Sequence, residues 1–540
     1  MNIDIVWSWL VGFMASFVLI MAADGGVLKR YWRSEILLYL GLVILGWSLW
    51  FYGEKSETSW YFGLVAGLAH ALIWLRFGVP WKERLIYRLV RKTSQLLGEP
   101  IDMRDLVKRA EKQTKEFDPR TYFKSGALFT GRDQDGQPCY LPLSMLRHVI
   151  VQGTTGTGKG RFLQVSAAQL IGEQEAVFYL DPKDDEYAAH VLYAVAEEHG
   201  REYRCIQLTA NQLPQLNILE GATEDEVVRI LEATFQLQDK GKPSDFYLAG
   251  DRKGIKRLAK NSAGKTCRDL FREACADPWY EEHAQNLLTR LEAIAEIRAI
   301  NAVEPKVSLS DLIEQKAVVY VRGELDSDAI RTVMRMVFIR LIQIASQRSR
   351  LDGPLPMINI IADELRFQLS SPVLMALSTS RDKGVRLWLA CQSSADVRAA
   401  EINLDKEAIE GILLENTPHK LTYRIEDPTT ADKLAEKSGR IRIHQCTIET
   451  ARNLMMVETV LKRSWRETQA RRVESNEFLS LPPGWAIYMA GPDVQLLQIA
   501  PICVVKNDAA LQIMAAKQSD DFADSSLDDI FSLSPEADHG

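Results

Sequence analysis

A strand, a glycine-rich loop and a helix follow one another between residues 149 and 171, and no other feature constrains the fold as strongly. The loop reads G-T-T-G-T-G-K-G over residues 153–160, directly after the apolar run V-I-V-Q. Loops of this kind wrap phosphates with backbone N–H groups at a helix N-terminus, and their lysine reaches the β- and γ-phosphates. The motif therefore predicts a nucleotide site formed by Gly153, Thr154, Thr155, Gly156, Thr157, Gly158, Lys159, Gly160 and Arg161.

One element of the usual phosphate-binding loop is absent. Gly160 stands where a serine or threonine hydroxyl normally binds Mg²⁺. The sequence leaves open whether water or another side chain fills that position.

A second motif is expected to complete the site, because such loops work with a strand that ends in an acid. The run M-I-N-I-I-A ends at Asp363 and Glu364. We expect Asp363 to hold Mg²⁺ and Glu364 to orient the attacking water. A solvated acidic pair at a strand end is the plain alternative. The strand that ends at Asp181-Pro-Lys183 is interpreted as a second edge near the nucleotide.

The rest of the chain beyond residue 120 predicts an α/β fold. Short apolar runs alternate with helical periodicity, which favours a mostly parallel sheet. Strands are predicted at 148–152, 176–181, 203–208, 317–321, 357–363, 385–391 and 421–425, with a hairpin over 124–145 turning at Asp135-Gly136. Residues 330–342 have the spacing of a packed helix. Between 215 and 305 the strands stop; a capping box at Thr223 and Glu226 predicts a helix through Gln238, and another helix is predicted over 279–300.

Three apolar runs near the N-terminus, at residues 5–23, 36–52 and 60–81, predict membrane spans. The loop after the first run and the segment after the third are basic, which places both in the cytosol and the N-terminus outside. Residues 82–98 predict a basic amphipathic helix at the lipid surface. The third run is the weakest span, since a partly interfacial segment would have the same pattern.

Composition excludes some classes of protein and leaves others open. Seven scattered cysteines with no C-x-x-C pair argue against a disulfide framework and a cysteine zinc site. The chain has 72 acidic and 65 basic residues, but seven acids and no lysine or arginine lie in residues 518–540. The remainder is therefore balanced, with 65 of each, so net charge does not decide on nucleic acid. Residues 251–272 carry eight basic residues against two aspartates, which suits a phosphate backbone or a solvated surface equally.

Taken together, the motifs resemble the coupling ATPases of type IV secretion and conjugation, the TraG/TraD-like proteins of the FtsK/HerA branch of P-loop motors. The resemblance rests on G-K-G at 158–160, D-P-K at 181–183 with Asp184 and Asp185 in place of Gly-Glu, D-E at 363–364, S-R-D-K-G at 380–384, Q-S at 392–393, the segment from Glu415 to Tyr423, and L-P-P-G at 481–484. It implies a RecA-like nucleotide-binding domain, with Gln392 sensing the γ-phosphate and Arg381 acting as an arginine finger. Lys159, Glu364, Arg381 and Gln392 are thus the candidate catalytic residues.

The resemblance implies a hexameric ring that uses ATP and Mg²⁺ at the bacterial inner membrane, multi-pass, with most of the chain cytoplasmic. Its partners would be a relaxase–single-stranded DNA complex (the relaxosome) and the components of the secretion channel. A receptor ATPase for protein cargo, a nucleotide-regulated membrane adaptor and an FtsK-type segregation motor are the alternatives. Gly160 favours the adaptor, whereas Lys159, Asp363 and Glu364 oppose it.

The predicted domains follow from these patterns. They are a membrane anchor of three spans at 1–81, a juxtamembrane helix and first part of the nucleotide-binding domain at 82–214, an all-α insertion at 215–305, the second part of that domain at 306–505 and an acidic tail at 506–540. In the tail, Phe522, Leu527, Ile530 and Phe531 interrupt the acids at helix-like spacing. The tail either recruits an adaptor or basic partner protein or keeps the chain soluble.

Overall fold

A computed structural model describes residues 107, 110 and 116–513, with gaps at 210–212, 239–245, 247, 350, 352, 354, 401–404, 453–457 and 492. The chain divides into two units, Asp102–Gly439 with Arg472–Gly540 and Met1–Ile101 with Arg440–Arg471. In the second of these units the structure describes a hairpin of two long antiparallel strands, β10 (Arg440–Arg452) and β11 (Glu458–Arg471). The site lies in the larger unit.

The larger unit is built on an 11-stranded mixed sheet in the order β2-β1-β13-β12-β9-β3-β8-β7-β4-β6-β5. The seven strands from β9 to β5 are parallel to one another, and the four from β2 to β12 extend the sheet in antiparallel fashion. The parallel strands are β9 (His419–Thr422), β3 (Val149–Gln152), β8 (Val385–Cys391), β7 (Ile358–Ala362), β4 (Ala176–Asp181), β6 (Val318–Arg322) and β5 (Tyr203–Gln207). The antiparallel ones are β2 (Pro138–Pro142), β1 (Ala127–Arg132), β13 (Asp493–Gln498) and β12 (Trp485–Ala490).

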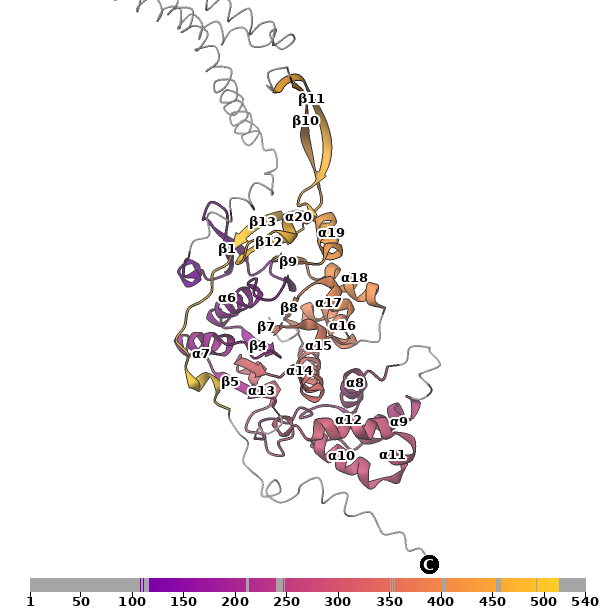
Figure 1. The fold of residues 1–540 in the computed structure, drawn as a ribbon. Helices are drawn as coiled ribbons and strands as arrows, with labels where there is room; N and C mark the ends of the chain where they lie inside the picture. The colour runs from indigo at the N-terminus through magenta and orange to yellow at the C-terminus, as the bar shows by residue number, and fades with distance from the viewer. Residues whose placement is uncertain are drawn as a thin grey trace, which may run out of the picture. The chain divides into compact units, whose positions relative to one another are not determined.

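Both faces of the parallel strands are buried, which explains their uninterrupted apolar sequences. In β4, Val177 and Tyr179 belong to the hydrophobic cluster on one face, and Phe178 and Leu180 to the cluster on the other. The first face is covered by α6 (Lys159–Gly172) and α7 (Ala188–Glu198), and the second by α14 (Asp328–Ser346), α15 (Leu365–Gln368) and α16 (Ser371–Thr379) (Figure 1).

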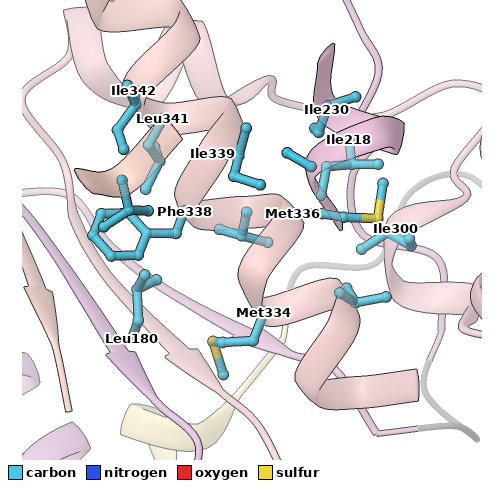
Figure 2. Close-up of a cluster of buried hydrophobic side chains, with 14 of the residues drawn as sticks. Leu180, Ile218, Ile230, Ile300, Met334, Met336, Phe338, Ile339, Leu341 and Ile342 are labelled. Atoms are coloured by element: carbon cyan, nitrogen blue, oxygen red, sulfur yellow. The ribbon is translucent and has the colours of Figure 1, made fainter. Parts of the chain in front are cut away.

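Between β5 and β6 all regular elements of the described residues are helical. A short segment carrying α13 (Leu309–Glu314) leads back into β6. Figure 2 shows how this part joins the sheet: α14 lies between Leu180 of β4 and Ile218, Ile230 and Ile300 of the helical segment. The other elements are α8 (Glu224–Thr234), α9 (Ala249–Ala259), α10 (Cys267–Ala276), α11 (Pro278–His283), α12 (Gln285–Ala295) and η4 (Arg298–Ile300).

Most predicted elements form, several of them with ends shifted by one residue, and three differ by more. The helix opened by the capping box ends at Thr234 instead of Gln238. The helix predicted over 279–300 is broken, because Ala284 leaves the helical conformation at φ −144° and ψ 40° between α11 and α12. The strand predicted at 421–425 begins and ends earlier, as β9, because its last residues leave the sheet.

The remaining elements connect the sheet. The hairpin of β1 and β2 turns at Gly136 (φ +79°), as predicted. After β8 come α17 (Ser394–Arg398) and α18 (Lys406–Asn416), and after β9 come α19 (Pro428–Lys437) and α20 (Ser475–Leu479). Short 3-10 helices are η2 (Pro119–Tyr122), η5 (Ser380–Lys383) and η6 (Asp508–Leu511).

The predicted membrane spans, the juxtamembrane helix over 82–98 and the acidic segment beyond residue 513 lie outside the described residues. In the part of the chain that the structure does describe, we find no helix with the length and apolar character needed to cross a bilayer. The predicted domain boundaries stay predictions.

Candidate nucleotide site

Four neighbouring parallel strands, β3, β8, β7 and β4, end at the same edge of the sheet. The phosphate-binding loop (residues 153–160) follows β3, and Gln392 follows β8. Asp363 and Glu364 follow β7, and Asp181 ends β4. Parallel topology therefore gathers the motifs that are separated by up to about 240 residues in the chain (152 to 392).

The phosphate-binding loop has the backbone that its glycines permit. Gly153, Gly156 and Gly158 have φ of +152°, +78° and +125°, a region that side-chain-bearing residues rarely adopt. Two of them are also closely covered by Tyr423. A Cβ added at Gly153 would lie 2.7 Å from the Tyr423 Cβ, and one at Gly158 would lie 2.9 Å from its ring.

Two later segments of the chain fix this loop from outside. The Thr154 N–H donates to the Arg424 carbonyl at 2.9 Å, just after β9. The Gly484 N–H donates to the Thr157 carbonyl at 3.0 Å, and Gly484 belongs to the L-P-P-G turn before β12. On the inner side, the Gly153 N–H donates to the Gln392 carbonyl at 3.2 Å. The loop is thus held in shape by backbone contacts.

Lys159 lies at the start of α6 and is buried at 7 % exposure. Its ammonium folds back into the loop, donating to the Gly153 carbonyl and, at 3.3 Å, to the Thr154 carbonyl. Burial lowers the pKa of Lys159, and the nearby Asp363 and Glu364 carboxylates oppose this shift. A buried lysine beside a glycine-rich loop at a helix N-terminus suits a phosphate chain.

The acid pair after β7 is buried as well. Burial raises the pKa of Asp363 to about 6, and the neighbouring Asp181 carboxylate adds to that rise. Glu364 has φ +48° and ψ +58°, a left-handed backbone that costs a non-glycine residue roughly 1–2 kcal/mol. Its carboxylate forms an ion pair with the Lys183 ammonium and lies 3.5 Å from the Gln392 side-chain nitrogen.

The loop after β4 is organised by Asp181, which is fully buried. Its carboxylate accepts hydrogen bonds from the Lys183 N–H at 2.9 Å, the Asp185 N–H at 2.7 Å and the Tyr320 hydroxyl at 2.8 Å. Burial raises the pKa of Asp181, and these hydrogen bonds counteract the rise. Asp181 thereby fixes the loop that presents Lys183 to Glu364.

The structure brings together most of the predicted site residues and separates one. Lys159, Asp363, Glu364 and Gln392 lie at the same edge of the sheet. Arg381 lies in η5, before β8 begins, at the opposite edge, where it is exposed. Within one chain it therefore does not reach the phosphate-binding loop. Of the remaining loop residues, Thr155 and Arg161 are exposed and Gly160 is partly exposed.

Three residues that the fold places at the site had no role predicted from the sequence. Lys183 pairs with Glu364, and Tyr423 and Arg424 cover the phosphate-binding loop. Lys183 was signalled only by its place in the D-P-K motif. Tyr423 was signalled only as the end of the segment from Glu415, and no local pattern indicated that it or Arg424 approaches the loop through the pairing of β9 with β3.

The side chains at this site fit Mg²⁺ only together with a bound nucleotide, whose phosphate oxygens supply further ligands. No group of three or more histidine, cysteine or acidic side chains able to hold a metal occurs among the described residues. Mg²⁺ in nucleotide sites is held by one or two carboxylates with phosphate oxygens and waters. A buried carboxylate at the position of Asp363, next to the phosphate cradle, satisfies that requirement.

A family model described as the TraM recognition site of TraD and TraG matches residues 358–483. The chain is 25% identical over 327 residues to Mobilization protein A of Escherichia coli, an alignment that covers 59% of this chain and 60% of that protein. It therefore spans less than two thirds of the length of this relative.

Among solved structures, the unbound form of the bacterial conjugative coupling protein TrwBdeltaN70 superposes with a TM-score of 0.56 at 14% identity, covering 74% of this chain and 93% of that one. The plasmid coupling protein TrwB in complex with ADP and Mg²⁺ gives a TM-score of 0.54 at 14% identity, covering 73% and 93%. These structures share the fold, and the predicted α/β class with a large, mostly parallel sheet is confirmed. The resemblance predicted from the motifs is confirmed with it.

Proposed function

Because this chain is a relative of the type IV coupling proteins, we propose that it is a coupling ATPase of the bacterial inner membrane. In this proposal it recruits a relaxase–DNA complex and couples ATP hydrolysis to delivery of that cargo into a secretion channel. The observation that carries the proposal is the convergence of Lys159, Glu364 and Gln392 at one edge of the sheet, beside a glycine loop in the phosphate-binding conformation.

In ATP hydrolysis the γ-phosphoryl group is transferred to water, and the residues of the site have different roles in this reaction. The loop N–H groups and Lys159 hold the phosphate chain, and Glu364 orients the attacking water. Asp363 would hold Mg²⁺, which would supply positive charge at the phosphate oxygens. Gln392 senses the γ-phosphate and is placed to influence Glu364, because its side-chain nitrogen lies 3.5 Å from the Glu364 carboxylate. Lys183 fixes the Glu364 carboxylate in place between turnovers.

Arg381 fits this scheme only between subunits. It is exposed at the edge opposite its own nucleotide site, so in a ring it is available to the site of a neighbouring copy. We propose a hexameric ring on this ground and on the family resemblance. The predicted spans would anchor each copy in the inner membrane, with the described residues in the cytoplasm.

The proposed partners follow from four features. The relatives named above act in conjugation and mobilization, which supports a relaxosome as cargo. The match to a TraM recognition model supports docking of a relaxosome protein on residues 358–483. The exposed basic side chains Lys253 and Lys256 of α9, with Lys260 directly after it, suit the backbone of single-stranded DNA. The acidic tail beyond residue 513 would recruit an adaptor.

The test is ATP turnover by the full chain in detergent, with and without single- and double-stranded DNA. We expect single-stranded DNA to raise turnover several-fold, and Lys159→Ala and Glu364→Gln to abolish it. Turnover indifferent to DNA would favour a receptor for protein cargo. A native chain that binds nucleotide without any turnover would replace the motor with a nucleotide-regulated adaptor.

The arginine finger is tested by mixing variants. Arg381→Ala and Lys159→Ala should each be inactive alone. Rings assembled from both should regain part of the turnover, because some interfaces then join an intact Lys159 to an intact Arg381. If the mixture stays inactive, Arg381 does not act across subunits.

A further inference from the structure

We propose that Asp185 takes over, in holding the Mg²⁺ of a bound nucleotide, the place of the hydroxyl that Gly160 lacks. This inference rests on the proposed function and assigns a residue to the gap in the phosphate-binding motif. The first observation concerns the atoms that would surround a side chain at position 160.

A Cβ built at Gly160 points toward two polar atoms, the Asp185 Oδ2 at 3.5 Å and the Gln164 Nε2 at 3.9 Å. The space normally used by a serine or threonine side chain is therefore faced by a carboxylate. Of the two atoms that face Gly160, only the Asp185 Oδ2 is an acceptor, because the Gln164 Nε2 is a donor that already bonds to the Asp185 Oδ1 at 3.0 Å. Carboxylate oxygen is a hard ligand of the kind Mg²⁺ prefers.

The two oxygens of Asp185 are used unequally. Oδ1 accepts from the Tyr187 N–H at 2.9 Å and the Ala188 N–H at 2.8 Å, besides the Gln164 side chain. Oδ2 accepts no hydrogen bond within the part of the chain that the structure describes, and it is the oxygen that faces Gly160. A residue that served only to cap α7 would need Oδ1 alone.

The Asp185 carboxylate is also rigidly placed relative to Asp363. Its own N–H is bound by the Asp181 carboxylate, and Asp181 follows Leu180, which pairs with Ala362 in the neighbouring strand. Asp181 and Asp363 thus leave the sheet at the same level. The loop fixed by Asp181 presents alternate residues to two parts of the site, Lys183 to Glu364 and Asp185 to Gly160.

The substitution Asp185→Asn separates the two uses, because asparagine keeps the Oδ1 acceptor that holds α7 and replaces Oδ2 with an amide nitrogen. Binding of the non-hydrolysable ATP analogue ADPNP to the full chain in detergent is measured against Mg²⁺ concentration. We expect Asp185→Asn to raise the Mg²⁺ requirement about tenfold, the usual scale for losing a supporting group at a metal site. Binding without Mg²⁺ should be unchanged. Electron paramagnetic resonance of Mn²⁺ with ADPNP should show a changed metal environment.

A second substitution that restores the Mg²⁺ requirement is the more specific test. In the Asp185→Asn background, Gly160→Ser should restore the native Mg²⁺ requirement, because it returns the hydroxyl, and the 3.5 Å clearance accepts a Cβ. Gly160→Ala is the matched control and should restore nothing.

Two results would overturn the inference. An Asp185→Asn chain with the native Mg²⁺ requirement, or equal rescue by Gly160→Ser and Gly160→Ala, would reduce Asp185 to a helix cap. A native chain that binds no ADPNP at any Mg²⁺ concentration would instead overturn the nucleotide site itself, and this inference with it.

Discussion

The parallel sheet and the helical segment between β5 and β6 bury their apolar residues in different ways. Strands such as β8 are covered on both faces, and all seven residues of Val385–Cys391 are buried. Helices α9 and α10 bury one face and expose the other, where basic residues gather. The sheet therefore depends on packing contributed by the whole unit, whereas the outer helices depend on a few local contacts and on their caps.

The same difference distinguishes the residues that serve function from those that stabilise the fold. In the sheet, the polar residues that matter stand at strand ends, just beyond the buried runs. In the helical segment, exposed charge is spread along the helix faces. Substitutions in the sheet should therefore act on the entire unit, and substitutions in the outer helices should act locally.

The largest effect is expected for Trp388→Ala in β8. Trp388 is fully buried, packs near Phe162 and donates to the Asn359 side chain at 3.2 Å. Its removal should lower the free energy of unfolding by about 3–5 kcal/mol. Denaturant unfolding measures this loss. Trp279→Ala in α11 is the matched control: Trp279 is half-buried and stacks with His283 and Arg257, so its loss should cost about 1 kcal/mol. Equal losses would remove the distinction between the two regions.

Acid should weaken the sheet through His148, at the start of β3. His148 is buried, its Nδ1 accepts from the Leu387 N–H at 3.0 Å, and burial lowers its pKa to about 4. Because the folded value lies below the ordinary 6.5, the unfolded chain binds the proton first as pH falls. Stability is fully present above pH 6.5 and declines toward pH 4, by about 3 kcal/mol in total.

The control for this pH dependence is His148→Asn, whose Oδ1 replaces the Nδ1 acceptor without titrating. Its free energy of unfolding should fall less between pH 6.5 and 4 than that of the native chain. An unchanged pH profile would show that other groups cause the acid sensitivity.

The phosphate-binding loop allows a comparison inside the site. Gly153→Ala would bring a Cβ to 2.7 Å of the Tyr423 Cβ, whereas Gly156→Ala meets nothing within 4 Å and bears only the cost of positive φ. We expect Gly153→Ala to weaken ADPNP binding more than tenfold and Gly156→Ala by about fivefold, which corresponds to about 1 kcal/mol. Equal losses would mean that Tyr423 yields and does not shape the loop.

The sequence was most informative where both faces of a strand are buried. The runs at 176–181 and 385–391 coincide with β4 and β8, because there the apolar stretch and the strand are the same residues. The prediction of a strand through residue 425 was wrong, because Tyr423 and Ile425 are buried without belonging to β9. The break at Ala284 was invisible to periodicity, because the apolar spacing continues across it.

At the site, strand ends could be predicted and the loops between them could not. Lys159, Asp363, Glu364 and Gln392 each follow or begin an element recognisable from sequence. The pairing of Lys183 with Glu364 and the approach of Asp185 to Gly160 bring together residues that are far apart in the chain, although the nearby Asp181 holds the loop itself. Such a loop conformation is set by three-dimensional contacts that no local pattern carries.

The smallest effect should test how independently the outer helices behave. The Thr266 side chain accepts from the Asp269 N–H at 3.2 Å and caps α10, with the Asp269 carboxylate returning to the Thr266 N–H at 2.8 Å. Thr266→Ala should cost about 1 kcal/mol. Hydrogen exchange is the measurement: amides of α10 and α12, which contact each other, should exchange about fivefold faster, while those of β4 and β8 keep their native rates. Thr266→Ser, which keeps the cap, is the control. If the strands accelerate as much as the helices, the segment and the sheet open as one cooperative unit and the contrast between them concerns sequence pattern alone.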